Sequence, residues 1–242
     1  MNTDILYTHI CSYVQISRDE FELFFSLFKS VYLKKGEFHY VAGKVPKYWS
    51  FTLKGCLREY WVDTQGNEKI FQFYEENTWV GQVESMITQK PTDMNLQALE
   101  DCELLCITGD DMCNAVKTPW IQHYTIQKSF ADNAAIMENS NRIKSASPEE
   151  LYLEILKKRP SLLLRVPQHY IANFLGIRKE TLSRVRRRVA HLWFVDPSQR
   201  YSIYVPIILQ RKTISSMLSM LALYKCDLIN HWVMAVFRII NY

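Results

Sequence analysis

The sequence predicts an α+β protein in which an antiparallel β-roll of the jelly-roll or cupin-like type precedes a long helix and a small helical domain. Short β-branched and aromatic runs alternate with turn residues over 31–108, a glycine-free stretch with helical spacing follows, and two short helical segments then flank Gly176. The chain has 242 residues, of which 48% are hydrophobic, so it can bury sizeable cores and is not intrinsically disordered.

The first predicted element is a short amphipathic helix over residues 17–29. Ser17 followed by Glu20 fits a capping box, in which side chain and backbone satisfy each other at a helix start. Phenylalanines at 21, 24, 25 and 28 recur at helical spacing. The predicted strands of the roll are VYL, YWSFTL, CLREYWV, KIFQFY, LQALE and CELLCIT.

A long helix is predicted over residues 118–144, where Pro119 is the only proline and apolar side chains follow a loose helical stripe. Such a helix either forms a dimer seam or packs against its own domain. Ser147 fits an N-cap and Pro148 the first position of the next helix, which marks the best domain boundary. The predicted divisions are 1–117 for the β-roll, 118–146 for the dimerisation helix, 147–205 for a helix-turn-helix domain and 206–242 for an apolar extension.

The charge is divided unevenly along the chain. Residues 1–141 contain 12 basic and 19 acidic side chains, whereas residues 142–242 contain 17 basic and 6 acidic ones. A basic second half points to a polyanionic partner, and the alternative is that these side chains merely solvate helix surfaces.

The basic side chains cluster on the second helix of a predicted helix-turn-helix. Apolar side chains over 170–175 form one cluster, Gly176 supplies the turn, and Ile177, Leu182 and Val185 form a second cluster. A helix at 178–189 would then present arginines to phosphates and base edges, unless it is only a solvated helix of a three-helix bundle. The candidate DNA-binding residues are Arg178, Lys179, Glu180, Thr181, Ser183, Arg184, Arg187 and Arg188.

This order of elements resembles the Crp/Fnr family of bacterial transcription regulators over residues 5–190. The segments that carry the resemblance are KKGEFHYVAG, LKGCLREYW, NLQALEDCELLCI and VPQHYIANFLGIRKETLSRVRRR. The resemblance implies a cytoplasmic homodimer joined through 118–144 that binds double-stranded DNA and contacts RNA polymerase. Lys179, Glu180, Thr181 and Arg184 match the family's base-reading and phosphate-contacting positions.

The resemblance also locates an effector pocket, and there the sequence departs from the cyclic-nucleotide pattern. The matching segment is WVGQVESMITQKPTDMNLQAL. Gly81 is kept, but Gln82 replaces the ribose-binding Glu, Thr92 the phosphate-binding Arg, and Asp93 the neighbouring hydroxyl residue. Loss of a charge-assisted Arg–phosphate contact beside an added carboxylate predicts no cyclic AMP or GMP binding in the usual mode. A pocket for another effector and no pocket at all both remain open.

The sequence contains no motif for a catalytic, cofactor or metal site. GxSxG, P-loop and GxGxxG patterns are absent, the six histidines have no metal-ligand spacing, and Cys11 is the only cysteine near the N-terminus, against an iron–sulfur cluster. The six irregular cysteines fit reduced thiols. Two alternatives are a ligand-binding or scaffold protein whose helix-turn-helix no longer reads DNA, and a cupin-like metalloenzyme, which the histidine spacing disfavours.

The C-terminal segment departs from the family pattern. Residues 191–205 predict a hairpin that could form the wing of a winged helix. Residues 206–242 are apolar, but charges interrupt them too often for a membrane anchor, and no secretory signal pattern begins the chain. Three interpretations remain for 206–242: extra packed helices, an interaction surface, or a degraded or frameshifted C-terminus.

Overall fold

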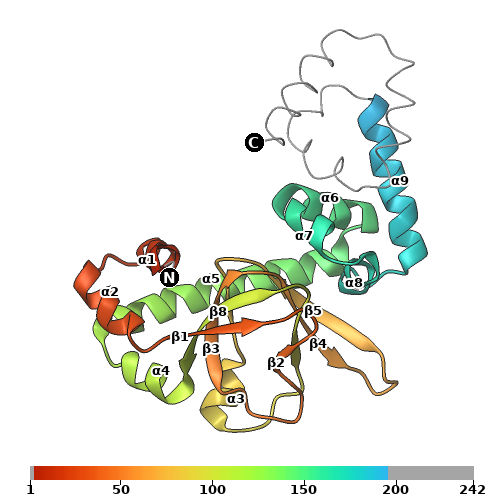
Figure 1. The fold of residues 1–242 in the computed structure, drawn as a ribbon. Coiled ribbons are helices and arrows are strands. Elements are labelled where there is room, and N and C mark those ends of the chain that lie inside the picture. The colour runs from red at the N-terminus through yellow and green to blue at the C-terminus, as the bar shows by residue number, and fades with distance from the viewer. Residues whose placement is uncertain (1–2, 196–242) are drawn as a thin grey trace. The chain divides into compact units, whose positions relative to one another are not determined.

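The computed structural model describes residues 3–195 and confirms the predicted α+β class (Figure 1). Two antiparallel sheets of four strands, ordered β1-β8-β3-β6 and β2-β7-β4-β5, form the N-terminal roll, and helices follow it. The strands are β1 Lys29–Leu33, β2 Phe38–Tyr40, β3 Tyr48–Lys54, β4 Leu57–Val62, β5 Glu68–Tyr74, β6 Trp79–Val80, β7 Asn95–Ala98 and β8 Cys102–Thr108. All six predicted runs are strands, whereas β2 and β6 are too short to leave a periodic pattern.

Strand β8 explains how the roll builds two cores. Leu104 and Cys106 pack in a core shared by both sheets, while Leu105 and Ile107 pack in a second core with the N-terminal helices. Because successive side chains of a strand point to opposite faces, a strand buried on both faces reads as the nearly continuous apolar run CELLCIT.

The second core includes a helix that the sequence patterns did not predict. Helix α1 (Thr3–Cys11) buries Leu6 and Ile10 completely beside Phe21 of helix α2 (Arg18–Phe25). The capping box that starts α2 is confirmed, with the Ser17 N–H 2.9 Å from the Glu20 carboxylate. The prediction that this helix extends to residue 29 is wrong, because β1 begins at Lys29.

Helices α3 (Val83–Thr88) and α4 (Gly109–Ala115) are short, and α5 (Pro119–Ser145) is the predicted long helix. Helix α3 lies within the roll, between β6 and β7, whereas α4 and α5 lead from the roll to the C-terminal part. In Figure 1, α5 runs from the roll to the C-terminal helices. Among residues 3–195, no helix is long and apolar enough to cross a membrane.

The C-terminal helices are α6 (Pro148–Lys158), α7 (Pro160–Arg165), α8 (Gln168–Phe174) and α9 (Lys179–Val195). The N-cap at Ser147 is confirmed: its N–H lies 2.7 Å from the Glu150 carboxylate, and Pro148 takes the first helical position. The predicted hairpin is wrong for residues 191–195, which continue α9. Because Pro197 is the first helix-breaking residue after Gly176, nothing in the sequence ends the helix earlier. The rest of that hairpin and residues 206–242 lie outside the described residues.

Candidate nucleic-acid interface

Helices α8 and α9 form a helix-turn-helix whose turn depends on Gly176. The residue has φ +66°, in the left-handed region that favours glycine. Its N–H donates to the Asn173 carbonyl at 2.9 Å, and the Ile177 N–H donates to the Ala172 carbonyl at 2.9 Å. These two bonds are those of a Schellman motif, which satisfies the last carbonyls of α8 and redirects the chain into α9.

One side of α9 packs into the C-terminal helical core. Leu182, Val185 and Val189 are at most 1% exposed, and α9 contacts both α6 and α8. Arg186 also faces α6, where it interacts with Tyr152; burial raises the pKa of that phenol and Arg186 opposes the rise. This side of α9 therefore serves the fold.

The other side of α9 and Arg178, which directly precedes the helix, carry the predicted DNA-binding residues. Arg178, Lys179, Glu180, Ser183, Arg184, Arg187 and Arg188 are exposed, and Thr181 is half-buried. The Nε of Arg188 lies 3.6 Å from the Glu149 carboxylate of α6. Within residues 3–195, no carboxylate pairs with Lys179, Arg184 or Arg187, so the basic charge of this side is not neutralised locally.

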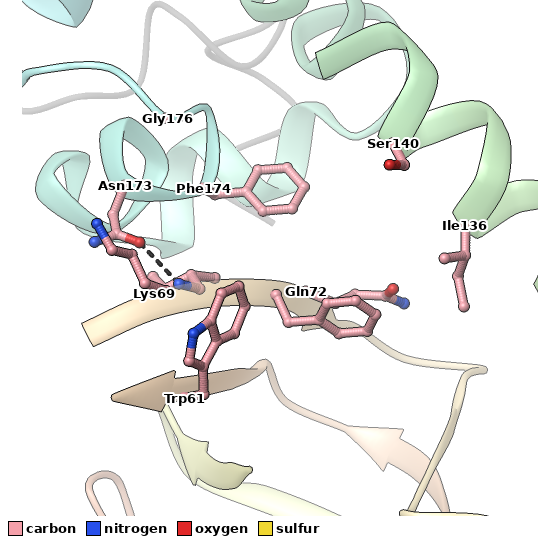
Figure 2. A pocket seen from close by; sticks show the side chains of 10 residues that line it. Trp61, Lys69, Gln72, Ile136, Ser140, Asn173, Phe174 and Gly176 are labelled. Atoms are coloured by element: carbon pink, nitrogen blue, oxygen red, sulfur yellow. Dashed lines mark hydrogen bonds between the residues drawn. The ribbon is translucent and has the colours of Figure 1, made fainter. Parts of the chain in front are cut away.

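Helix α8 docks on the edge strand β5 through Asn173, a contact that the sequence patterns did not predict. Its Oδ1 accepts the Ile70 N–H at 2.8 Å, the bond dashed in Figure 2, and its Nδ2 donates to the Glu68 carbonyl at 2.7 Å. The rings of Phe73 and Phe174 meet edge to face at 5.4 Å. The Asn173 side chain thus pairs one N–H and one C=O of β5, which is the last strand of its sheet.

Two arginines at the ends of α7, Arg159 at its N-cap and Arg165 as its last residue, reinforce this contact. Arg159 donates to the Glu75 carboxylate and to the Phe73 carbonyl, both at 2.8 Å. Arg165 donates two hydrogen bonds, of 2.8 and 2.7 Å, to Glu76 and also contacts Glu100. Burial favours a raised pKa for Glu76, but the bonds from Arg165 and from backbone N–H groups outweigh it and lower that pKa. Charged pairs therefore fasten the helical domain to the roll.

Arg58 connects β4 to helix α8. Its side chain is only 4% exposed, pairs with the Glu68 carboxylate, and donates to Gln97. The guanidinium lies 4.2 Å from the ring centre of Tyr60 and 4.1 Å from that of Tyr170 on α8. The sequence contained a sign of this site, because two charged residues at 58–59 interrupt an otherwise apolar strand. It gave no indication of which residues contact Arg58.

The four predicted effector-pocket residues lie around the start of α3 and the approach to β7. Gly81 has φ +153°, and a Cβ there would lie 2.7 Å from Cδ1 of Trp49. Gln82 precedes α3 without capping it. Thr92 is 7% exposed, and its hydroxyl accepts the Met94 N–H at 3.1 Å, while Asp93 is exposed.

The amide of Gln82 instead joins a buried carboxylate that the sequence patterns missed. Glu59 on β4 is 0% exposed and accepts hydrogen bonds from Gln82, from the Tyr40 hydroxyl, and from the Tyr74 hydroxyl at 2.7 Å. Burial is the main cause, and the nearby Glu59 charge the second cause, of a raised pKa for both tyrosines. Both hydroxyls therefore stay protonated and can donate to Glu59. The Gln82 position thus faces a carboxylate of the protein itself.

Comparisons with known proteins agree with this architecture. Residues 30–118 match the cyclic nucleotide-binding domain family. The solved structure of the c-di-GMP-responsive global regulator CLP from Xanthomonas campestris is similar at 15% identity and TM-score 0.59, over 72% of this chain and 92% of that chain. A regulator assigned to the crp/fnr family from Eubacterium rectale is similar at 17% identity and TM-score 0.58, over 74% and 85% of the two chains.

FixK2 from Bradyrhizobium japonicum is similar at 15% identity and TM-score 0.54, over 68% of this chain and 85% of that chain. The search of curated proteins gave no match. At these identities the structural likeness establishes the fold. The chain thus carries a cyclic nucleotide-binding domain within the fold of the Crp/Fnr transcription regulators.

Proposed function

We propose that this protein is a homodimeric, sequence-specific DNA-binding regulator that inserts α9 into the major groove. The carrying observation is the exposed, locally unneutralised basic side of α9 directly after the Gly176 turn. Arginine can read guanine edges and neutralise phosphates, and Glu180 can accept a hydrogen bond from a cytosine amino group. As a regulator of this kind, it acts in the cytoplasm beside RNA polymerase and performs no catalysis.

An apolar stripe on α5 supports the dimer. Ile126, Phe130 and Met137 are 47%, 72% and 66% exposed. They lie four and seven residues apart, and Asn133 occupies the position between the last two in a heptad pattern. Apolar side chains at this spacing bury each other across a pair of helices, and a single Asn in such a seam favours one register. A two-fold dimer presents its α9 helices to half-sites about 34 Å apart.

The dimer is tested by Phe130→Glu, with Ile87→Glu as the matched control because Ile87 is similarly exposed, at 68%, on α3. Sedimentation should find that the first change converts dimer to monomer and that the second leaves the dimer intact. A wild-type chain that remains monomeric at micromolar concentration contradicts the proposed seam.

DNA recognition is tested by fluorescence anisotropy of the full chain on its own upstream DNA and on scrambled DNA, across a salt series. Specific binding with a steep salt slope is expected. Arg184→Ala should cost about 1–3 kcal/mol and relax sequence preference, whereas Arg187→Ala should weaken all DNA binding and flatten the slope. Lys90→Ala, an exposed change on the roll, is the control. Equal, weak binding to both DNAs favours a protein whose helix-turn-helix no longer reads sequence.

We further propose that the effector pocket does not hold cyclic AMP in the usual mode. The Thr92 side chain is buried and hydrogen-bonded to backbone, and Gln82 is engaged by Glu59. None of the four predicted pocket residues carries a positive charge that could balance the charge of a phosphate. Calorimetry should detect no cyclic AMP binding at micromolar concentration, and tight binding would overturn this assignment.

A further inference from the structure

Two neighbouring carboxylates at the start of helix α6 have different partners. Glu150 belongs to the capping box: its carboxylate accepts the Ser147 N–H at 2.7 Å, and the bonds from the backbone and hydroxyl of Ser147 lower the pKa of Glu150. That box does not include Glu149, whose carboxylate lies 3.6 Å from Nε of Arg188 on α9. The Glu149 side chain therefore faces the proposed DNA-binding helix instead of capping its own.

Arg188 stands at the border between the two sides of α9. It follows the exposed Arg184 by four residues and precedes the buried Val189 by one, in a helix of about 3.6 residues per turn. When such a helix lies in the major groove, the side chains that point into the groove read base edges, and those at the flanks of the helix meet the phosphate backbones. The Arg188 side chain is 65% exposed, so its guanidinium is open to a phosphate on this flank.

The contact between Arg188 and Glu149 is weak enough to be exchanged for another. A distance of 3.6 Å is too long for a hydrogen bond, and both side chains meet solvent, with 28% of the Glu149 side chain exposed. An ion pair in this setting shifts an equilibrium by at most about fivefold. An arginine–phosphate contact forms charge-assisted hydrogen bonds and releases a counterion from the DNA. A DNA phosphate can therefore displace the carboxylate.

This pairing distinguishes Arg188 from the neighbouring arginines, because Arg184 and Arg187 have no carboxylate partner within residues 3–195. We propose that Glu149 is a positioning residue of the DNA interface: in the free protein it holds Arg188 in place of a phosphate, and DNA displaces it on binding. The Glu149 carboxylate thereby lowers the affinity for any DNA and leaves discrimination to the residues that face the bases. This inference rests on the proposed DNA-binding function, although it requires contacts with phosphates only and not the reading of sequence.

The test is fluorescence anisotropy of the full chain on scrambled DNA, where phosphate contacts supply the affinity. Glu149→Gln should raise this affinity about two- to fivefold at low salt, because Arg188 is released to the phosphate. The matched control is Glu84→Gln, which removes the same charge at an exposed position of α3 and should leave the affinity unchanged. Arg188→Gln should weaken binding and flatten the slope of log affinity against log salt by about 0.9, the value for one phosphate contact. In the Arg188→Gln background, Glu149→Gln should no longer raise the affinity.

Two results would overturn the proposal. If Glu149→Gln weakens DNA binding or leaves it equal to that of the Glu84→Gln control, the pair serves only to hold α9 against α6. If Glu149→Gln raises the affinity as much in the Arg188→Gln background as in the wild type, the carboxylate repels DNA directly and does not act through Arg188. Failure of the proposed function has a different signature, which is equal affinity of the wild-type chain for its own upstream DNA and for scrambled DNA. Circular dichroism of each variant verifies the fold.

Discussion

Replacing Asn173 with alanine should loosen the contact between the helix-turn-helix and the roll. The change removes both side-chain bonds to β5, to the Ile70 N–H at 2.8 Å and from Nδ2 to the Glu68 carbonyl at 2.7 Å. Gly176 and the buried side of α9 are untouched, so α8 and α9 should still form. The perturbation therefore acts on the docking of α8 and leaves its folding intact.

The size of the effect follows from the two bonds. Each contributes about 0.5–1.5 kcal/mol net, which gives a destabilisation of about 1–3 kcal/mol. The Phe73–Phe174 contact and the Arg159 bonds to Glu75 and Phe73 remain, so the domain should stay attached for most of the time. Because about 1.4 kcal/mol corresponds to a factor of ten, exchange of the Ile70 amide hydrogen should accelerate by about five- to a hundredfold.

Amide hydrogen exchange at single-residue resolution is the direct assay. Gln168→Ala is the control, because Gln168 lies on the same helix and its side chain makes no hydrogen bond within residues 3–195. If Ile70 exchanges at the wild-type rate in Asn173→Ala, the α8 contact does not protect the β5 edge. That result would falsify the docking of α8 on β5 through Asn173.

Three other changes test separate features. Gly81→Ala places a Cβ 2.7 Å from Cδ1 of Trp49 at φ +153° and should cost about 1–3 kcal/mol in urea unfolding; a cost under about 0.5 kcal/mol contradicts the crowding. Burial lowers the pKa of His39 from 6.5 to about 4, so between these values the unfolded chain takes up a proton that the folded chain does not. The free energy of unfolding therefore falls as pH falls through that window. His39→Gln should abolish about 2–3 kcal/mol of the decrease measured between pH 7 and 4.5. If the decrease is unchanged in the variant, the lowered pKa of His39 is not its cause. Arg165→Met removes the shared partner of Glu76 and Glu100 and should destabilise the chain by about 1–3 kcal/mol at pH 7. The control is Lys157→Met, a change at an exposed position of α6. Equal stability of the two variants argues against a stabilising role for the Arg165 contacts.

Local patterns in the sequence were sufficient for most elements. The six longer strands followed from β-branched and aromatic runs, and the Ser17 and Ser147 caps from spacing to a Glu three residues on. The turn after α8 followed from Gly176, since only glycine adopts φ +66° readily. The two caps and the turn depend on interactions between residues at most five positions apart, which the order of residues alone determines.

The same patterns also carry the candidate site on α9. Burying Leu182, Val185 and Val189 orients the rest of the helix outward, so the exposure of Arg184 and Arg187 follows from helical period. Arg186 shows the limit of this reasoning, because it is as basic as its neighbours yet faces Tyr152. The sequence therefore predicts that this helix is basic, whereas its packing against α6 decides which of its arginines are exposed.

Local patterns in the sequence suffice for the six longer strands, the long helix, the capped starts of α2 and α6, and the basic helix after Gly176. The burial of Glu59 and Arg58 and the contact of Asn173 with β5 depend instead on tertiary packing. Asn173 and Ile70 lie 103 positions apart, and no local period relates them. A buried polar side chain is tolerated only where hydrogen-bonding partners meet it, and the folded chain alone assembles those partners.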